Sequence, residues 1–278
     1  MFERLGRSLE LASASWRVLQ SDKSLLVLPL LSGLALALII ASFALPALTD
    51  PQWAAMFQKS KSAHSPKAGH YVLLWVMYLI SFLVMTFFNT ALAIVVLARA
   101  DGHVLSIGQG LREARSKLPD LLMYALVSAT IGIVLEFVDE RVPIIGKLAV
   151  GLFGVAWSIA TYLAIPVLAA ENVGPGEAIA RSLKLLRTCW GEGLVGTAGL
   201  RVAAGAITAL VALIAIGMMS VGSSTLPGFA FGIAGIAAVS LVFTALDAIY
   251  RASLYRYAMD GESGPFDEHL LSGAFHER

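Results

Sequence analysis

The sequence has few charged residues for its length. Asp, Glu, Lys and Arg make up 14% of its 278 residues, whereas 58% of the residues are hydrophobic. Soluble domains carry about a quarter charged residues, and a water-soluble chain of this size could not hide so much apolar surface in its interior. The composition therefore excludes an ordinary water-soluble domain.

Other shortages exclude classes of site. The single cysteine, Cys189, cannot form a disulfide within the chain or a cysteine cluster for a metal. The net charge of +1 leaves no basic excess for nucleic acid. The sequence also contains no His-Glu-x-x-His, Gly-x-Ser-x-Gly or phosphate-loop motif. We therefore expect a protein without enzymatic activity, cofactor, metal or nucleic-acid partner.

Long apolar runs are abundant. Six of them are near the length of about 20 residues that the hydrocarbon core of a bilayer requires: residues 25–48, 71–97, 121–138, 148–170, 203–222 and 228–249. The first run is too long for the apolar part of a signal peptide, so we expect a retained membrane helix. Because backbone groups in a bilayer must bond within their own segment, the runs predict an all-α, polytopic membrane fold with six transmembrane helices.

The basic residues predict an orientation. Fourteen Lys and Arg residues lie in the N-terminal segment, after the second and fourth runs, and in the C-terminal tail, whereas five lie in the segments on the other side. Cytoplasmic segments of membrane proteins are enriched in Lys and Arg. We therefore expect a multi-pass protein of the cell inner membrane with both termini in the cytoplasm.

An amphipathic segment precedes the first, third and fifth runs. Apolar residues recur there at steps of three and four, and each segment ends in a polar break with an acid, Asp22, Asp120 or Glu192. The pattern predicts three repeats of an amphipathic cytoplasmic helix followed by a transmembrane hairpin. The repeats cover about residues 1–98, 102–170 and 174–258 of a single domain, 1–278, with a short cytoplasmic tail, 259–278.

The amphipathic segments supply the candidate lipid-facing residues. A basic amphipathic helix can lie in the membrane interface with Trp and Leu in the acyl region and Lys and Arg at anionic headgroups. The alternative is that these helices only pack against the cytoplasmic end of the bundle. The candidates are Trp16, Arg17, Arg112, Arg115, Arg181, Lys184, Arg187 and Trp190.

Ionisable residues at membrane depth are a second lead, because a charge in the bilayer is costly unless it is paired or hydrated. Arg201 precedes the fifth run, and Asp247 lies at the end of the sixth, four residues before Arg251. One hypothesis pairs Arg201 with Asp247 in a polar cytoplasmic vestibule. The alternative is that Arg201 extends to the interface and Asp247 bonds Arg251 along its helix.

Other residues in the runs suggest helix packing. Gly228, Gly232 and Gly235 share one helix face, as do Gly151, Gly154 and Ser158, and small residues allow close helix contacts. Asn89 is a polar group that needs a partner. Pro166 lies near the end of the fourth run, and no run is visibly broken in its middle, which counts mildly against a transporter.

A block in the second half of the chain resembles a family signature. It includes 157–162 (Trp-Ser-Ile-Ala-Thr-Tyr), 165–168 (Ile-Pro-Val-Leu) and 171–175 (Glu-Asn-Val-Gly-Pro), and it continues through Arg181-Ser182 to 190–192 (Trp-Gly-Glu). Together with residues 16–19, 29–31 and 254–258, this block is similar to a prokaryotic family of six-span membrane proteins classed as a domain of unknown function. The resemblance implies the six-helix fold and the inner-membrane location. It implies no activity and no site residues.

These observations predict a membrane module that binds lipid or a partner, such as another membrane protein or a second copy of the chain. The alternative is a transporter or channel for a small solute or lipid, with Arg201 and Asp247 near its cytoplasmic vestibule. Repeats by themselves favour neither function.

Overall fold

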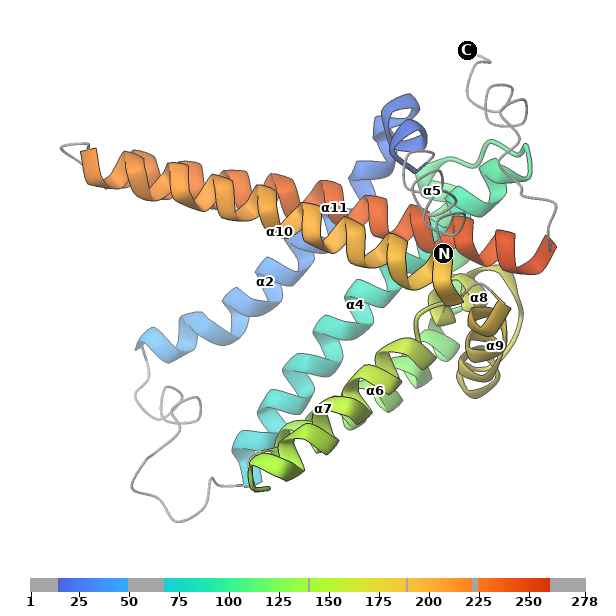
Figure 1. Ribbon diagram of the computed structural model, residues 1–278, viewed down its shortest axis with the longest axis horizontal. Coiled ribbons are helices and arrows are strands. Elements are labelled where there is room, and N and C mark those ends of the chain that lie inside the picture. The colour runs from blue at the N-terminus through green and yellow to red at the C-terminus, as the bar shows by residue number, and fades with distance from the viewer. Residues whose placement is uncertain (1–14, 50–67, 140, 189, 222–224, 261–278) are drawn as a thin grey trace. The chain divides into compact units, whose positions relative to one another are not determined.

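The computed structural model describes residues 15–49, 68–139, 141–188, 190–221 and 225–260, and every regular element in them is a helix. Figure 1 shows their course along the chain. After helical residues 15–21, the elements are η1 (Lys23–Leu26), α2 (Val27–Thr49), α4 (Ala68–Ala100), α5 (Ile107–Ser116), α6 (Leu118–Asp139), α7 (Ile144–Ala160), α8 (Ala164–Ala170), α9 (Pro175–Thr188), α10 (Trp190–Val221) and α11 (Leu226–Asp260).

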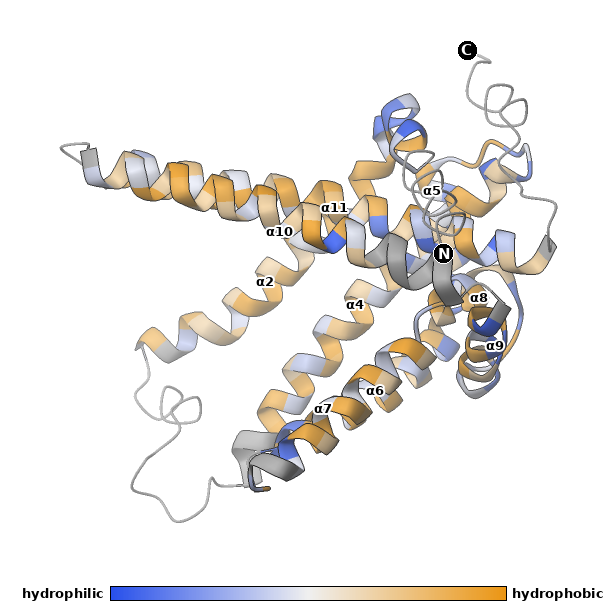
Figure 2. Ribbon diagram, viewed as in Figure 1, coloured by the Kyte–Doolittle hydropathy of each residue, from blue (hydrophilic) through white to orange (hydrophobic). Residues whose placement is uncertain are grey.

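Six helical stretches are long and apolar enough to cross a membrane. They are Lys23–Pro46, Val72–Ala100, Leu118–Asp139, Gly146–Ala170, Ala198–Ser220 and Leu226–Met259. Figure 2 shows the apolar residues along the long helices, for example α10 and α11. The predicted all-α fold with six membrane-spanning helices is confirmed, and the protein is a multi-pass membrane protein. The predicted similarity of the three repeats and their grouping in one domain stay predictions.

Local signals explain several helix ends. Ser106 and Gln109 bond each other's backbone N–H groups at the start of α5, which is the reciprocal capping arrangement. Gly102 follows α4 with φ +78, and the N–H groups of Gly102 and His103 donate to the carbonyls of Arg99 and Ala98. Glycine adopts this left-handed conformation without strain, so it ends α4 cleanly.

The chain divides into two compact units that share helices. One unit consists of Met1–Leu30, Leu92–Gly110 and Lys184–Arg278, and the other of Leu31–Ala91 and Leu111–Leu183. The core of the first includes Leu28, Leu92 and Tyr250, all fully buried. In the second, the ring of Phe82 lies 5.9 Å from that of Tyr124 and 6.0 Å from that of Tyr78.

Glycines determine how closely α10 and α11 approach within the first unit. A Cβ atom on Gly228 would lie 2.5 Å from Met219 Cγ and 2.7 Å from the carbonyl oxygen of Ala215. Gly232 and Gly235 face Ala215 and Val211 in the same way. The predicted contact face on the sixth span is confirmed. The corresponding prediction for the fourth span is wrong at Gly151, where a Cβ would meet nothing within 4 Å.

Two predicted helix boundaries are wrong. The fifth span belongs to a helix that begins at Trp190 and runs through the expected break at Gly191-Glu192, because no proline or competing cap stops it there. The fourth span is two helices, since α7 ends at Ala160 and α8 begins at Ala164. Pro166 accounts for this interruption, because its ring would clash with the carbonyl of Tyr162 in a continuous helix.

Candidate functional site

Asp247 and Arg251 form an ion pair along α11, with 2.6 Å between Oδ2 and Nη2. The contacts of Gly232 with Ala215 and of Gly235 with Val211 set an antiparallel register that brings Arg201 to the level of Asp247. Arg201 is nevertheless exposed, and no ion pair joins it to any residue that the structure describes. The structure thus brings together Asp247 and Arg251, and it leaves Arg201 apart from both.

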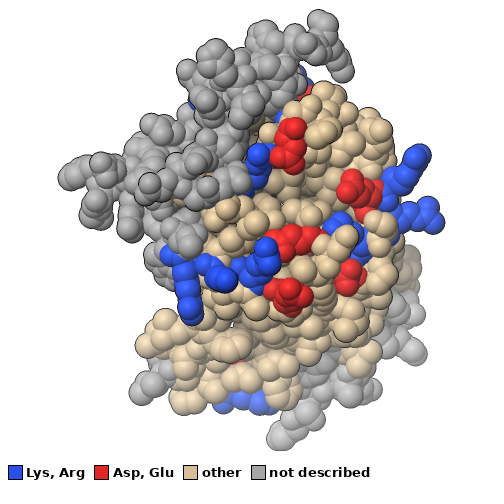
Figure 3. Space-filling model, turned by 90° about the vertical axis from the view of Figure 1, so that its right-hand side faces the viewer, with Lys and Arg blue, Asp and Glu red and all other residues tan. Residues whose placement is uncertain are grey.

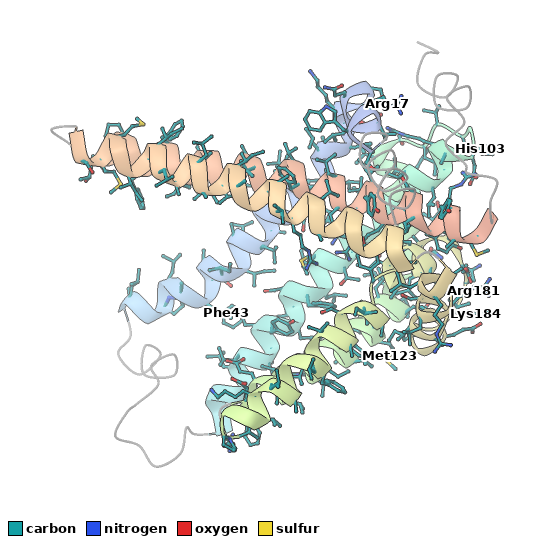
Figure 4. The ribbon with its side chains drawn as sticks, viewed as in Figure 1. Arg17, Phe43, His103, Met123, Arg181 and Lys184 are labelled. Carbon is teal, nitrogen blue, oxygen red and sulfur yellow. The ribbon has the colours of Figure 1, made fainter. Side chains whose placement is uncertain are left out.

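The short helices α5 and α9 expose their basic residues. In α5, Arg112 and Arg115 are exposed, whereas Ala114 is buried. In α9, Lys184 and Arg187 are exposed, whereas the opposite face, Ala178, Ser182, Leu185 and Leu186, is buried. Figure 4 labels Arg181 and Lys184 along α9. Each helix therefore has one packed face and an exposed side that carries two basic residues as well as an acid, Glu113 in α5 and Glu177 in α9.

The remaining predicted lipid-facing residues lie in two places. Trp16 and Arg17 are exposed in helical residues 15–21, next to buried Ser15, Val18 and Leu19. Trp190 is the first residue of α10 rather than part of the preceding amphipathic helix, and its side chain lies outside the described residues. The expected tail, 259–278, is described only through residue 260.

An ion pair between Asp22 and Arg99 was not predicted. Asp22 caps η1 by accepting a hydrogen bond from the N–H of Ser24 (2.8 Å), and its second carboxylate oxygen bonds Arg99 at the end of α4. Arg99 is 7% exposed and also donates to the carbonyl of Leu105 at 3.4 Å. Burial alone would raise the pKa of Asp22, but the Ser24 hydrogen bonds and the charge of Arg99 lower it below the ordinary 3.8.

A second unpredicted pair lies in the same unit. Arg256 of α11 donates to Asp101, just after α4, with 2.5 Å between Nη1 and Oδ1. Both pairs join residues far apart in the sequence, at the ends of membrane-spanning helices. The sequence signal was present, since the residues are charges close to the ends of apolar runs, but the pairing depends on the fold.

The second unit has a polar cluster around the segment between α8 and α9. Lys117, between α5 and α6, donates through Nζ to the carbonyl of Glu171 (2.9 Å) and to Oδ1 of Asn172 (3.4 Å). Arg181 Nε pairs with Glu171 Oε2 at 2.8 Å. Burial lowers the pKa of Lys117 below its ordinary 10.5, against the opposing effect of Glu113, Asp120 and Glu171. The cluster connects Lys117 and Arg181, in the middle of α9, with the end of α8.

A side chain of α9 bonds a backbone group at the interruption of the fourth span. Ser182, fully buried, accepts a hydrogen bond at 2.9 Å from the N–H of Leu163, one of the residues between α7 and α8. Thr161 donates to the carbonyl of Trp157 at 2.8 Å. Backbone groups at a helix break must find partners when they are away from water. Ser182 therefore stabilises the break between α7 and α8 by accepting this hydrogen bond.

Replacing Ser182 by alanine is expected to destabilise the protein by about 1–2 kcal/mol, because the buried N–H of Leu163 loses its acceptor. The measurement is equilibrium unfolding in lipid discs. Ser158→Ala, at an exposed position of α7, is the matched control and should leave stability unchanged. Equal stability of the two variants would refute the role of Ser182.

Several acidic side chains form ion pairs with basic ones. Asp22, Asp101, Glu171 and Asp247 each bond a basic side chain, so each pair is close to neutral. Figure 3 shows acidic side chains beside basic ones on one face, with further Lys and Arg side chains projecting outward. Among the described residues, no three His, Cys, Asp or Glu side chains group as a metal site requires. The exposed charged residues of α5 and α9 include the bases Arg112, Arg115, Lys184 and Arg187 and the acids Glu113 and Glu177.

Comparison with known protein families shows to which family the chain belongs. A model described as a family of unknown function, DUF6159, matches residues 68–266. The chain belongs to this family. The DUF6159 match includes the signature block between Trp157 and Glu192 and excludes the first span. Curated proteins yielded no match. Membership of DUF6159 supports the predicted resemblance and assigns no activity.

Proposed function

We propose that this DUF6159 protein is a non-enzymatic inner-membrane module that binds anionic lipid headgroups through the basic faces of α5 and α9. The observation that supports it is the exposure of Arg112, Arg115, Lys184 and Arg187, none of which forms an ion pair with any residue in the described part of the chain. A cationic face beside a membrane span attracts anionic lipid by about 1 kcal/mol for each Lys or Arg.

The proposal includes the predicted orientation. Helices α5 and α9 follow the second and fourth spans, where the excess of Lys and Arg favours the cytoplasmic side. The packed faces of both helices fix their basic faces in place, so binding does not require ordering of a free segment. Both termini are then cytoplasmic as well.

The test compares the protein in discs of zwitterionic lipid and in discs that also contain phosphatidylglycerol. Bound anionic lipid stabilises the folded state, so the unfolding midpoint should rise in the anionic discs. Replacing Lys184 and Arg187 by glutamine should weaken binding by about 30-fold, which is the loss of about 2 kcal/mol, and should remove most of that rise.

The matched control replaces the same number of charges on the predicted opposite side. Arg141 and Lys147 flank the start of α7, and their replacement by glutamine should leave the difference between the two kinds of disc unchanged. Equal loss in both double variants would mean that only net charge matters and would overturn the proposed site. A stoichiometric protein partner bound through the same faces would replace the lipid in the proposal.

A transporter or channel is the second candidate, and the interrupted fourth span is the observation that favours it. Discontinuous membrane helices often form substrate sites in transporters, and α7 and α8 are such a pair. Osmotic swelling of proteoliposomes in urea or glycerol tests this function. Swelling no faster than in empty liposomes favours the lipid-binding proposal, and faster swelling favours the second candidate.

A further inference from the structure

Three polar side chains lie on one face in the middle of the second span. Thr86, Asn89 and Thr90 are spaced three and four residues apart in α4, and the span covers Val72–Ala100. Residues at these spacings share a helix face. No Asp, Glu, Lys or Arg lies between residues 72 and 98. The face is therefore polar but uncharged, at the depth where a bilayer contains least water.

None of the three side chains has a hydrogen-bond partner among the described residues. Thr86 and Thr90 are 1% and 0% exposed, and both hydroxyl oxygens are buried without a partner. Asn89 is half-buried, and its amide makes no hydrogen bond in the part of the chain that the structure describes. Other hydroxyls in the spans, those of Thr130, Thr161, Ser220 and Ser253, donate to the carbonyl one turn earlier. Thr86 and Thr90 depart from that pattern, as does Ser128 in the third span.

The burial of Thr86 and Thr90 limits which groups can bond their hydroxyls. A buried polar group without a hydrogen bond costs about 1–3 kcal/mol, so the two buried hydroxyls beside the half-buried Asn89 would carry a large penalty in the centre of a membrane. Because Thr86 and Thr90 are inaccessible from outside, neither lipid headgroups nor bulk water can supply the bonds. A small polar molecule inside the protein can supply them.

The chemistry of the groups limits that molecule. Hydroxyl and carboxamide groups both donate and accept hydrogen bonds and have no charge. A charged solute would lose its hydration here without gaining an opposite charge. Buried water typically makes about three hydrogen bonds to protein groups that otherwise lack partners, which matches three side chains on one turn.

We propose that Thr86, Asn89 and Thr90 form a hydrated site at mid-depth in the membrane, in which water bonds the two hydroxyls and the amide. The inference rests on α4 alone. It is independent of lipid binding by α5 and α9, so either proposal can fail without the other. A wet site in the second span also distinguishes this bundle from one packed only by apolar side chains.

Isosteric removal of the hydroxyls tests the proposal. If the site is dry, Thr86→Val and Thr90→Val each remove an unpaired hydroxyl and should raise the unfolding midpoint. If water occupies the site, each valine removes a hydrogen bond to that water, and the midpoint should fall by about 2–4 °C. An unchanged or higher midpoint for both variants contradicts the proposal. Thr130→Val, at an exposed hydroxyl that bonds its own helix, is the control and should change little.

Discussion

Replacing Arg99 by leucine is expected to destabilise the protein by about 3 kcal/mol, because it leaves the Asp22 carboxylate without its cation. Arg99 connects the start of η1, the end of α4 and the carbonyl of Leu105. The value is at the lower end of the range for buried pairs, since Asp22 is 26% exposed and water can partly replace Arg99. Equilibrium unfolding of the two proteins in lipid discs measures the difference.

The double variant Asp22→Asn/Arg99→Leu controls for the size of the side chain. It should be more stable than Arg99→Leu alone, because no unpaired charge remains. The pair should also show in the pH dependence. The lowered pKa of Asp22 stabilises the fold above its ordinary 3.8, and this contribution disappears as the pH falls below that value. Asp22→Asn should lack that part of the pH dependence. If Arg99→Leu is as stable as the wild type, the pair has no structural role.

Replacing Gly228 by alanine is expected to cost about 1–3 kcal/mol by overpacking the contact between α10 and α11. Its Cβ would meet the backbone oxygen of Ala215 at 2.7 Å, and backbone cannot move aside as a flexible side chain can. The two helices would have to separate, which also weakens the contacts of Gly232 and Gly235. Thermal unfolding in discs measures the loss.

Gly205→Ala is the matched control for that change. A Cβ atom on Gly205 meets nothing within 4 Å, and alanine is the better helix former by about 1 kcal/mol. We therefore expect Gly205→Ala to be at least as stable as the wild type. Equal destabilisation by the two substitutions would show that the glycines serve helix flexibility rather than close packing.

The sequence predicted the spans well because their signal is local. A run of about 20 apolar residues is sufficient to identify a membrane helix. Helix ends were less certain, because an apolar run does not determine where its helix stops. The beginning of α10 at Trp190 and the interruption after Ala160 both differ from the predicted boundaries. Pro166 was a usable signal for the interruption. A proline has no N–H to donate to the carbonyl four residues earlier, so the helical hydrogen bond at that position is lost.

The polar contacts could be predicted only where they are local. The pair of Asp247 with Arg251 is four residues apart on one helix and follows from spacing. Asp22 and Arg99 are 77 residues apart, and Asp101 and Arg256 are 155 apart. No pattern along the chain indicates which isolated charges meet, because that depends on how the spans pack. The need of Asn89 for a partner was visible in the sequence, whereas the unpaired hydroxyls of its neighbours required the structure.

Mass spectrometry of the protein extracted in native-lipid discs tests the central claim most directly. The proposal predicts that anionic phospholipid is enriched over the surrounding membrane. It also predicts that the enrichment falls when Lys184 and Arg187 are replaced by glutamine, but persists when Arg141 and Lys147 are. A lipid composition equal to that of the bulk membrane for the wild type would contradict lipid binding by the basic faces of α5 and α9.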